Sequence, residues 1–326
     1  MNSIDFESVI ITVFVLVDDW YQSEGKALKT LSPGAKSEMS DSEIITLALV
    51  MDYLPFPGET QFIGFIRANY GQWFPQLLTQ SQFNRRLRKL GQMIETLRQP
   101  GVRQLGGGNA NSFIIDTKPI PVMGYRRSKG HSDFHGSAEY GYCAARKMKY
   151  FGYKLVMIST LKGLPIAYEL VPANVDERQA VEGVLEMVHN SDIYGDKGFI
   201  GQNWQQQITS STGNKIWTIH RDNQHHQLSA PVKRLIAKVR QRIERGSHSL
   251  QRRQSHSFAM TMARRAVRRR AQGQVSLEGV FHEIQNTGRN PERLLNKTVG
   301  GLSTHMAAKI ASHTLRLLLR DRFAID

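Results

Sequence analysis

Hydrophobic residues in the first hundred positions recur at the three- and four-residue spacing of amphipathic helices. The clearest case is SEMSDSEIITLALVMDYL, in which Ser40 and Glu43 form a capping box ahead of the apolar positions. The apolar run at residues 9–17 has acidic residues on both sides and is too short to span a bilayer, so it predicts a buried helix. A further helix is predicted over residues 79–98. Residues 1–105 are therefore expected to be all-helical.

The pattern changes after the glycine-rich segment QLGGGNANS, which is the best linker candidate. FIID at residues 113–116 predicts a short strand, and residues 150–173 predict a hairpin that turns at Lys162 and Gly163. Later strands are predicted in DIYGDKGF and NKIWTIHR. Helices are expected between the strands, one of them capped by Asn174 or Asp176 and another by Ser229. This order predicts an α/β domain over residues 106–326, a mixed sheet flanked by helices with ligands at its strand ends.

The net charge of the chain indicates which class of partner it binds. The formal net charge is +15, which favours binding to a polyanion, most commonly nucleic acid. The alternative is a soluble protein that is merely basic. The single cysteine, Cys143, excludes an intramolecular disulfide and any cysteine-rich zinc site, and fits a reducing compartment.

Two aspartates follow short apolar runs, Asp116 after the first strand and Asp196 after DIYG. Neighbouring carboxylates repel each other unless a cation lies between them, and hard oxygen ligands suit Mg²⁺ or Mn²⁺. A third carboxylate from a nearby helix, such as Glu244, would complete a site for two metal ions. The alternative is ordinary: aspartates at strand ends often form turns or cap helices, and helical glutamates usually face solvent.

Four segments in order, IIDTKPIPV, YFGYKLVMISTLKGLPIAYELVPANVDERQA, IYGDKGFIG and RQRIE, resemble the insertion sequence 982 family of bacterial DDE transposases. The resemblance extends into MSDSEIITLAL and SQFNRRL and into the C-terminal tail. It implies a ribonuclease H-like core in which an Asp-Asp-Glu triad holds two Mg²⁺ or Mn²⁺ ions. Asp116 would be the first acid and Asp196 the second.

The resemblance also implies a function. Such a protein is a polynucleotidyl transferase that nicks DNA and transfers the strand, binding the terminal inverted repeats of its element and the target DNA. Synapsis of two ends implies a homodimer or a larger assembly. We expect a bacterial cytoplasmic protein, nucleoid-associated when bound to DNA, with no membrane contact.

The sequence pattern expected around the third acid is split between two positions in the chain. The family places an arginine four residues before this glutamate and a phenylalanine three residues after it. Glu244 has Arg240 before it but lacks the phenylalanine, whereas Glu278 has Phe281 after it but lacks the arginine. We interpret this as a 34-residue insertion that splits one helix. Glu244 is favoured, with Glu278 as the alternative, because its helix directly follows the strand NKIWTIHR.

The segment between these glutamates, residues 245–277, contains eight arginines and no lysine, aspartate or glutamate. Such a composition indicates an acquired insertion. Three interpretations stay open: an unselected interruption that inactivates the enzyme, a basic arm that contacts DNA, or a structured insertion with another role.

Cationic residues near these features are the predicted DNA contacts, with a solvated surface as the alternative. On the predicted helix 79–98 they are Arg85, Arg86, Arg88 and Lys89. Near the acids they are Lys118, Lys197 and Arg240, and in the loop after the first strand Arg126, Arg127 and Lys129. Four rings near this loop could stack on unpaired bases or belong to the sheet core: Tyr125, Tyr150, Phe151 and Tyr153.

Two other functions remain in view. An insertion that displaces the third acid would leave a catalytically inactive DNA-binding remnant. A complete metal site without synapsis would give a nuclease that lacks strand transfer.

Overall fold

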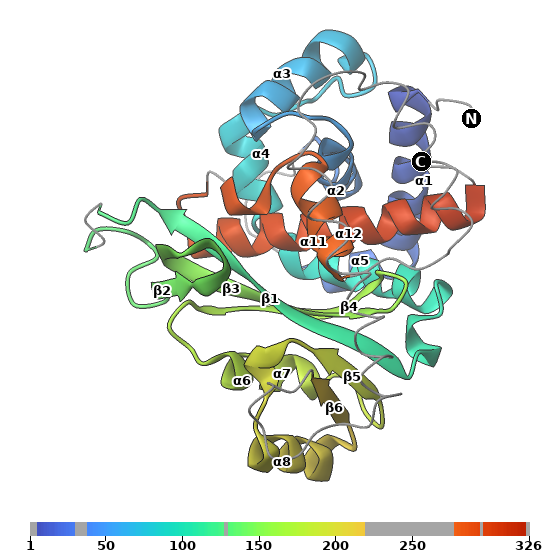
Figure 1. Cartoon of the computed structure of the whole chain (residues 1–326). Coiled ribbons are helices and arrows are strands. Elements are labelled where there is room, and N and C mark those ends of the chain that lie inside the picture. The colour runs from blue at the N-terminus through green and yellow to red at the C-terminus, as the bar shows by residue number, and fades with distance from the viewer. Residues whose placement is uncertain (1–4, 30–37, 127–129, 219–276, 294–295, 324–326) are drawn as a thin grey trace, which may run out of the picture. The chain divides into compact units, whose positions relative to one another are not determined.

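The computed structural model describes residues 5–29, 38–126, 130–218, 277–293 and 296–323 (Figure 1). The chain divides into two compact units. The first comprises Met1–Gly106, Pro119–Tyr153 and Glu283–Asp326, and the second comprises Gly107–Lys118 and Lys154–His282. Residues 219–276, which include the arginine-rich segment up to residue 276 and the predicted helix capped by Ser229, lie outside the described residues.

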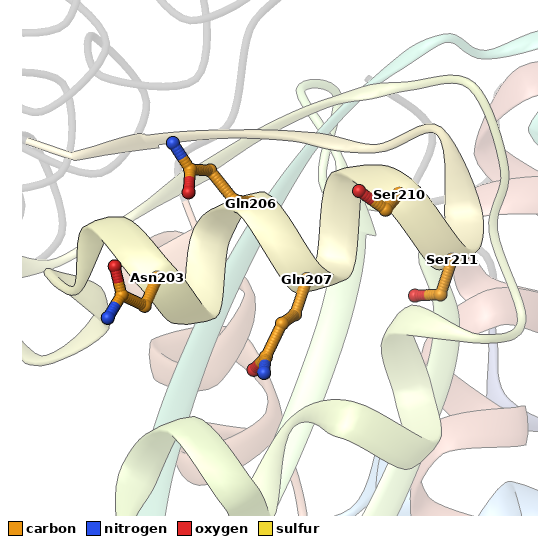
Figure 2. Close-up of a pocket in the computed structure, with 5 residues that line it drawn as sticks. All are labelled: Asn203, Gln206, Gln207, Ser210 and Ser211. Atoms are coloured by element: carbon orange, nitrogen blue, oxygen red, sulfur yellow. The ribbon is translucent and has the colours of Figure 1, made fainter.

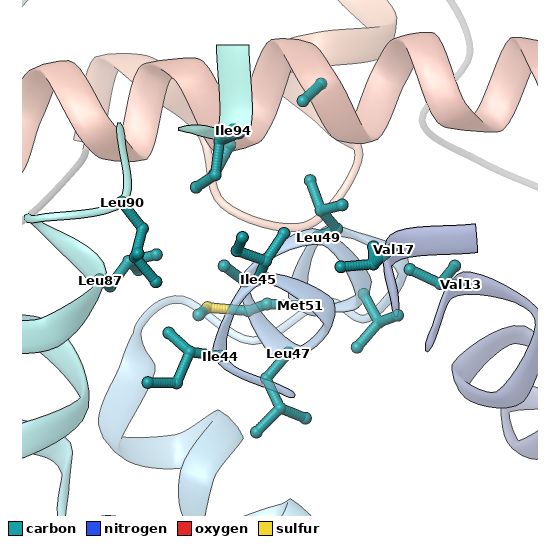
Figure 3. Close-up of a cluster of buried hydrophobic side chains, with 14 of the residues drawn as sticks. Val13, Val17, Ile44, Ile45, Leu47, Leu49, Met51, Leu87, Leu90 and Ile94 are labelled. Atoms are coloured by element: carbon teal, nitrogen blue, oxygen red, sulfur yellow. The ribbon is translucent and has the colours of Figure 1, made fainter. Parts of the chain in front are cut away.

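The first unit is built mainly from helices that surround one apolar core. Its helices of eight or more residues are α1 (Phe6–Ser23), α2 (Asp41–Val50), α3 (Glu59–Tyr70), α4 (Gln80–Leu87), α5 (Gly91–Gln104) and α12 (Val299–Phe323). The side chains of α2 lie at the centre. Figure 3 shows Ile44, Ile45, Leu47, Leu49 and Met51 between Val13 and Val17 of α1 and Leu87, Leu90 and Ile94. The helical prediction for the N-terminal region is confirmed.

Capping explains where two of these helices begin. The Ser40 hydroxyl accepts from the Glu43 backbone N–H at 3.1 Å, and the Glu43 carboxylate accepts from the Ser40 N–H. This is the predicted capping box. Asp5 caps α1 by accepting from the Ser8 N–H at 2.7 Å. Helix α1 contains the predicted apolar run, but only one side of that run is buried: Val9, Ile10, Val13 and Val17 are buried, whereas Ile11 and Val15 are exposed. Among the described residues no helix is long and apolar enough to cross a membrane.

The prediction of a single helix over residues 79–98 is wrong. The chain forms α4 and α5 with a turn between them, because Leu90 leaves helical geometry at φ −101° and ψ 3°. Gly91 then begins α5 in close contact with α12. A Cβ atom at position 91 would lie 2.8 Å from the Thr304 hydroxyl, so the turn places a glycine where larger residues would collide.

A buried ion cluster joins α12 to the end of α2. Asp52 accepts from Arg289 at 3.2 Å and from the Lys309 amine at 3.3 Å, and all three side chains are at most 3% exposed. Burial alone raises the pKa of Asp52, but the charges of Arg289 and Lys309 outweigh it and hold that pKa below its usual value. Burial lowers the pKa of Lys309 to about 8. The cluster therefore pairs one buried anion with two cations, and it carries a net positive charge while Lys309 is protonated.

The strands form one mixed sheet in the order β2-β3-β1-β5-β6, with β4 paired to β3. The strands are β1 (Ser112–Met123), β2 (Glu139–Cys143), β3 (Met148–Thr160), β4 (Pro165–Pro172), β5 (Asp192–Gly195) and β6 (Lys215–Thr218). Strands β1, β5 and β6 are parallel, and β2 is antiparallel to β3. The predicted α/β mixed sheet, preceded by a helical region, is confirmed.

In the second unit, α6 (Glu177–Ala180), α7 (Glu182–Leu185) and α8 (Gln202–Thr212) contribute to an apolar core on one side of the strands. Phe113 and Ile115 of β1 point into this core. Asp176 caps α6, as one of the two predicted caps. The prediction of one continuous helix after this cap is wrong, because Val181 separates α6 from α7.

Candidate active site at the ends of two parallel strands

The register of β1 and β5 brings the two predicted aspartates to the same level. Ser112 pairs with Asp192 and Ile114 pairs with Tyr194, so partners differ by eighty positions. The same difference relates Asp116 to Asp196. Since neighbouring strands lie about 4.8 Å apart, these residues stand side by side just beyond the last pair. Both belong to the second unit.

Alternation along the strands assigns both aspartates to one face. Ile115 points into the helix-covered core, and a Cβ atom added at Gly195 would lie 3.2 Å from its side chain and 2.6 Å from Phe199. Positions 115 and 195 therefore face the helices. Since successive side chains of a strand point to opposite faces, Asp116 and the residue that follows Gly195 belong to the other face.

The two aspartates differ in their surroundings. Asp116 is half-buried, and its carboxylate accepts from the Thr117 N–H at 2.7 Å. Asp196 is exposed and precedes a short 3₁₀ turn, in which its backbone carbonyl accepts from the Phe199 N–H at 3.1 Å. The prediction that Asp116 ends its strand is wrong, because β1 continues to Met123. It is the pairing with β5 that stops there, so the carboxylates still lie at the end of the parallel pair.

Lys118 lies two positions after Asp116, on the same face of β1. Its side chain is buried, and its amine lies 5.5 Å from the ring centroid of Phe281 in helix α11 (Leu277–Asn286). Phe281 is itself buried. Phe281 of α11 therefore packs on the face of β1 that carries Asp116.

The third acid cannot be placed in the same way. Glu278 lies in α11, three positions before Phe281, but its side chain is outside the described part. Glu244 and Arg240 are also outside the described residues, as is the side chain of Lys197. Within the described part of the chain, no group of three or more His, Cys, Asp or Glu side chains gathers closely enough to hold a metal ion.

The other polar residues of β5 serve the sheet. The Trp217 indole N–H donates to the Asp192 carboxylate at 2.8 Å, which ties β6 to β5. Burial raises the pKa of Tyr194, and the Asp192 charge raises it further, so the phenol stays neutral at physiological pH. Asp116 and Asp196 lie toward the carboxyl end of this strand pair, whereas Asp192 lies at the start of β5.

The predicted DNA-contacting cations fall into different environments. Arg86 donates to the Asp41 carboxylate at 2.5 Å and to the Met39 carbonyl, so it holds α4 against the start of α2. Four other predicted DNA-contacting cations are exposed: Arg85, Arg88, Lys89 and Arg126. Arg127 and Lys129 lie outside the described residues.

The predicted aromatic surface is largely sheet core. Tyr150, Phe151 and Tyr153 are buried, whereas Tyr125 is exposed. Two exposed rings that the sequence prediction missed, Tyr140 and Tyr142, lie on β2. The alternation in EYGYC is the signal that could have identified them, since it places both tyrosines on one face of a short strand.

An open depression lies along α8 and is separate in its chemistry from the aspartate pair (Figure 2). Amides and hydroxyls line it: Asn203, Gln206, Gln207, Ser210 and Ser211. It therefore offers no carboxylate, imidazole or thiol for acid–base or metal chemistry.

Comparison with known proteins gives one match that bears on this geometry. The family model of the transposase DDE domain matches residues 108–273, which is half of the chain and includes Asp116, Asp196 and Glu244. No curated protein and no solved structure matches. The chain belongs to the transposase DDE domain family.

Proposed function

We propose that this protein is the transposase of a bacterial insertion sequence of the 982 family, and that it nicks DNA and transfers the strand in the cytoplasm. The observation that carries the proposal is the level placement of Asp116 and Asp196 at the end of a parallel strand pair, in a chain of the transposase DDE family. Two side-by-side carboxylates on one face of a sheet suit divalent metal ions and the in-line displacement of phosphodiesters.

The chemistry of the donors fits Mg²⁺ or Mn²⁺, since both groups are carboxylates where the β1–β5 pairing ends, on the face opposite the α6–α8 core. Two such ions, when bound, would supply activation of the attacking oxygen and stabilisation of the leaving oxygen. Asp116 is held by the Thr117 N–H, so its carboxylate is oriented in advance. Lys118 adds positive charge on the same face, and Lys197 follows the second acid directly.

Two observations bear on the third acid. The match to the family model includes Glu244 and ends before Glu278. The packing of Phe281 on Lys118 instead holds α11 over the face of β1 that carries Asp116. We therefore propose that the third acid comes from one edge of the interrupted helix, either Glu244, which the sequence favours, or Glu278.

Matched substitutions separate these two glutamates. If Glu278 is the third acid, Glu278→Gln abolishes Mg²⁺-dependent nicking while Glu244→Gln retains it, and the reverse result assigns Glu244. Deletion of residues 245–278 joins Glu244 to Gly279 and rebuilds a continuous helix with both Arg240 and Phe281 in place. A gain of nicking in that deletion would show that the insertion inactivates the enzyme.

DNA binding is proposed for the helical first unit. An exposed cationic surface is formed by Arg85 in the last turn of α4 and by Arg88 and Lys89 in the turn that follows it. This surface suits the phosphates of a terminal inverted repeat. Joining two ends requires at least two copies of the protein. Simultaneous replacement of the three cations by alanine should weaken duplex binding and reduce its dependence on salt.

The function is tested with the purified protein and DNA carrying the ends of its element. We expect Mg²⁺-dependent nicks at the element boundary and joined products with a target plasmid. Nicks without joined products would indicate the nuclease alternative, and DNA binding without nicks would indicate the inactive remnant.

A further inference from the structure

Strand β2 displays aromatic rings to solvent on one face. Tyr140 is 48% exposed and Tyr142 is 57% exposed, and their alternate positions place them on the same side of the strand. Tyr125, which follows β1, is 45% exposed. Among the described residues, seven large hydrophobic side chains are at least 45% exposed, and three of the seven are these tyrosines. Exposed aromatic surface that gathers in one place indicates a binding site.

The rings are held in place by one another and by the core. The Tyr125 and Tyr140 rings meet edge to face, with centroids 5.3 Å apart and planes at 78°. Tyr140 also contacts the buried Phe151 at 5.0 Å and 62°. Each such contact adds stability beyond the area it buries. Tyr140 is therefore anchored through Phe151, and it needs little ordering before it stacks on a ligand.

Cations border these rings. Lys149 of β3 is the register partner of Tyr142, and Lys147 lies in the turn between the strands at φ 49°. Arg126 follows Tyr125 directly, and all three cations are exposed. Arg146 is different, because it pairs with Glu292 at 2.5 Å and fixes the turn. Glu139 begins β2 at the alternate position, so it faces away from the rings.

Rings bordered by cations fit unpaired nucleotides. Bases stack on aromatic side chains while phosphates pair with lysine and arginine, and the faces of bases are accessible only where the duplex is open. A second protein strand could instead pair with the edge of β2, but the exposed Arg126, Lys147 and Lys149 beside the rings suit the phosphates of a nucleic acid rather than a protein backbone. The positive border therefore favours single-stranded DNA over a protein partner.

We propose that Tyr125, Tyr140 and Tyr142 form a platform that stacks the unpaired bases of the DNA substrate. Arg126, Lys147 and Lys149 bind the phosphates on either side. The inference rests on the proposed function in one respect, namely that the substrate is DNA whose strands open near the cleavage site. It adds a named surface for the opened strand.

The test measures binding of the full-length protein to a single-stranded oligonucleotide that contains 2-aminopurine, in EDTA so that no nicking is needed. Tyr142→Ala should weaken this binding about 5- to 100-fold and reduce the change in 2-aminopurine fluorescence. Tyr142→Phe retains the ring and should bind like the wild type. Met187→Ala, at another exposed hydrophobic position, is the matched control and should have no effect.

Three results would overturn the proposal: unchanged single-strand binding in Tyr142→Ala, an equal loss for a duplex of the same length, or the same loss in Tyr142→Phe. Loss of a dimer in Tyr142→Ala would assign the surface to a second copy instead. Since Tyr140 packs on Phe151, Tyr142→Ala and Lys149→Ala carry the test if Tyr140→Ala does not fold. Nicking activity is measured separately, so failure of the platform is distinguishable from failure of the proposed function.

Discussion

Acidic residues serve opposite purposes in the two units. In the first unit, Asp52 is almost completely buried and is neutralised by Arg289 and Lys309. In the second unit, Asp116 is half-buried and Asp196 exposed, and strand register holds them side by side. A buried acid surrounded by cations stabilises the fold, whereas two adjacent acids that solvent can reach are suited to take up a metal ion. Burial and partners distinguish the two roles, which residue type alone does not.

The largest effect should follow replacement of one acid of the strand pair. We expect Asp196→Asn to reduce nicking more than about 1,000-fold, since loss of a charged group at a catalytic centre commonly has effects of this size. Because Asp196 is exposed, the unfolding free energy should change by less than about 0.5 kcal/mol. A nicking assay and urea denaturation of the same variant check both expectations. Retained nicking would remove Asp196 from the active site.

The reverse pattern is expected for the buried cluster. Asp52→Asn leaves Arg289 and Lys309 without their counter-charge in the core, so we expect a loss of about 3–5 kcal/mol in unfolding free energy. Asp19→Asn, an exposed acid on α1, is the control and should change little. Guanidinium denaturation measures both variants. A stable Asp52→Asn protein would mean that the cluster contributes no net stability.

A smaller, pH-dependent effect is expected at the buried pair of His305 and Glu59, whose side chains lie 2.7 Å apart. Burial lowers the pKa of His305 below 6.5, although the contact with Glu59 opposes this. The folded state therefore binds the proton less readily than the unfolded state, and stability present above pH 6.5 is lost as the pH falls below it. Burial raises the pKa of Glu59, but hydrogen bonds led by His305 lower it overall, which adds a further loss at more acidic pH.

Urea denaturation between pH 8 and pH 5 measures this effect. We expect His305→Gln to flatten the decline relative to the wild type, and His189→Gln, at an exposed histidine, to leave it unchanged. Parallel curves of unfolding free energy against pH for His305→Gln and the wild type would show that protonation of His305 does not cause the loss of stability.

The smallest effect should come from an ion pair near the surface. Arg146 is 42% exposed and pairs with Glu292. Solvent screens such pairs, so Arg146→Ala should cost less than about 1 kcal/mol, in contrast to Asp52→Asn. The same denaturation experiment checks this. A cost equal to that of the buried cluster would show that burial does not separate the two kinds of ion pair.

The sequence was a good guide where local signals decide the structure. The capping box at Ser40 and Glu43, the turn at Gly163 between β3 and β4, and the alternation of strands and helices are all present. It was a poor guide where distant contacts decide. The break before Gly91 depends on α12, and Arg86 turns to Asp41 rather than to solvent.

The candidate site shows the same division. Each aspartate can be identified from the apolar run before it, but the register that sets Asp116 level with Asp196 is a contact across eighty residues. Alternation in EYGYC places Tyr140 and Tyr142 on one face, but the exposure of that face depends on β2 lying at the edge of the sheet, which is a non-local feature. The third acid stays undecided because residues 245–277 separate the two halves of its sequence pattern.

The most direct test of the paired-aspartate site measures Mn²⁺ binding to the full-length protein by electron paramagnetic resonance. The Asp116→Asn/Asp196→Asn double variant should bind Mn²⁺ at least about tenfold more weakly than the wild type, because two carboxylate ligands are lost. Asp192→Asn, which removes the acid that bonds Trp217, should bind like the wild type. Equal Mn²⁺ affinity in the wild type and the double variant would contradict a metal site at Asp116 and Asp196.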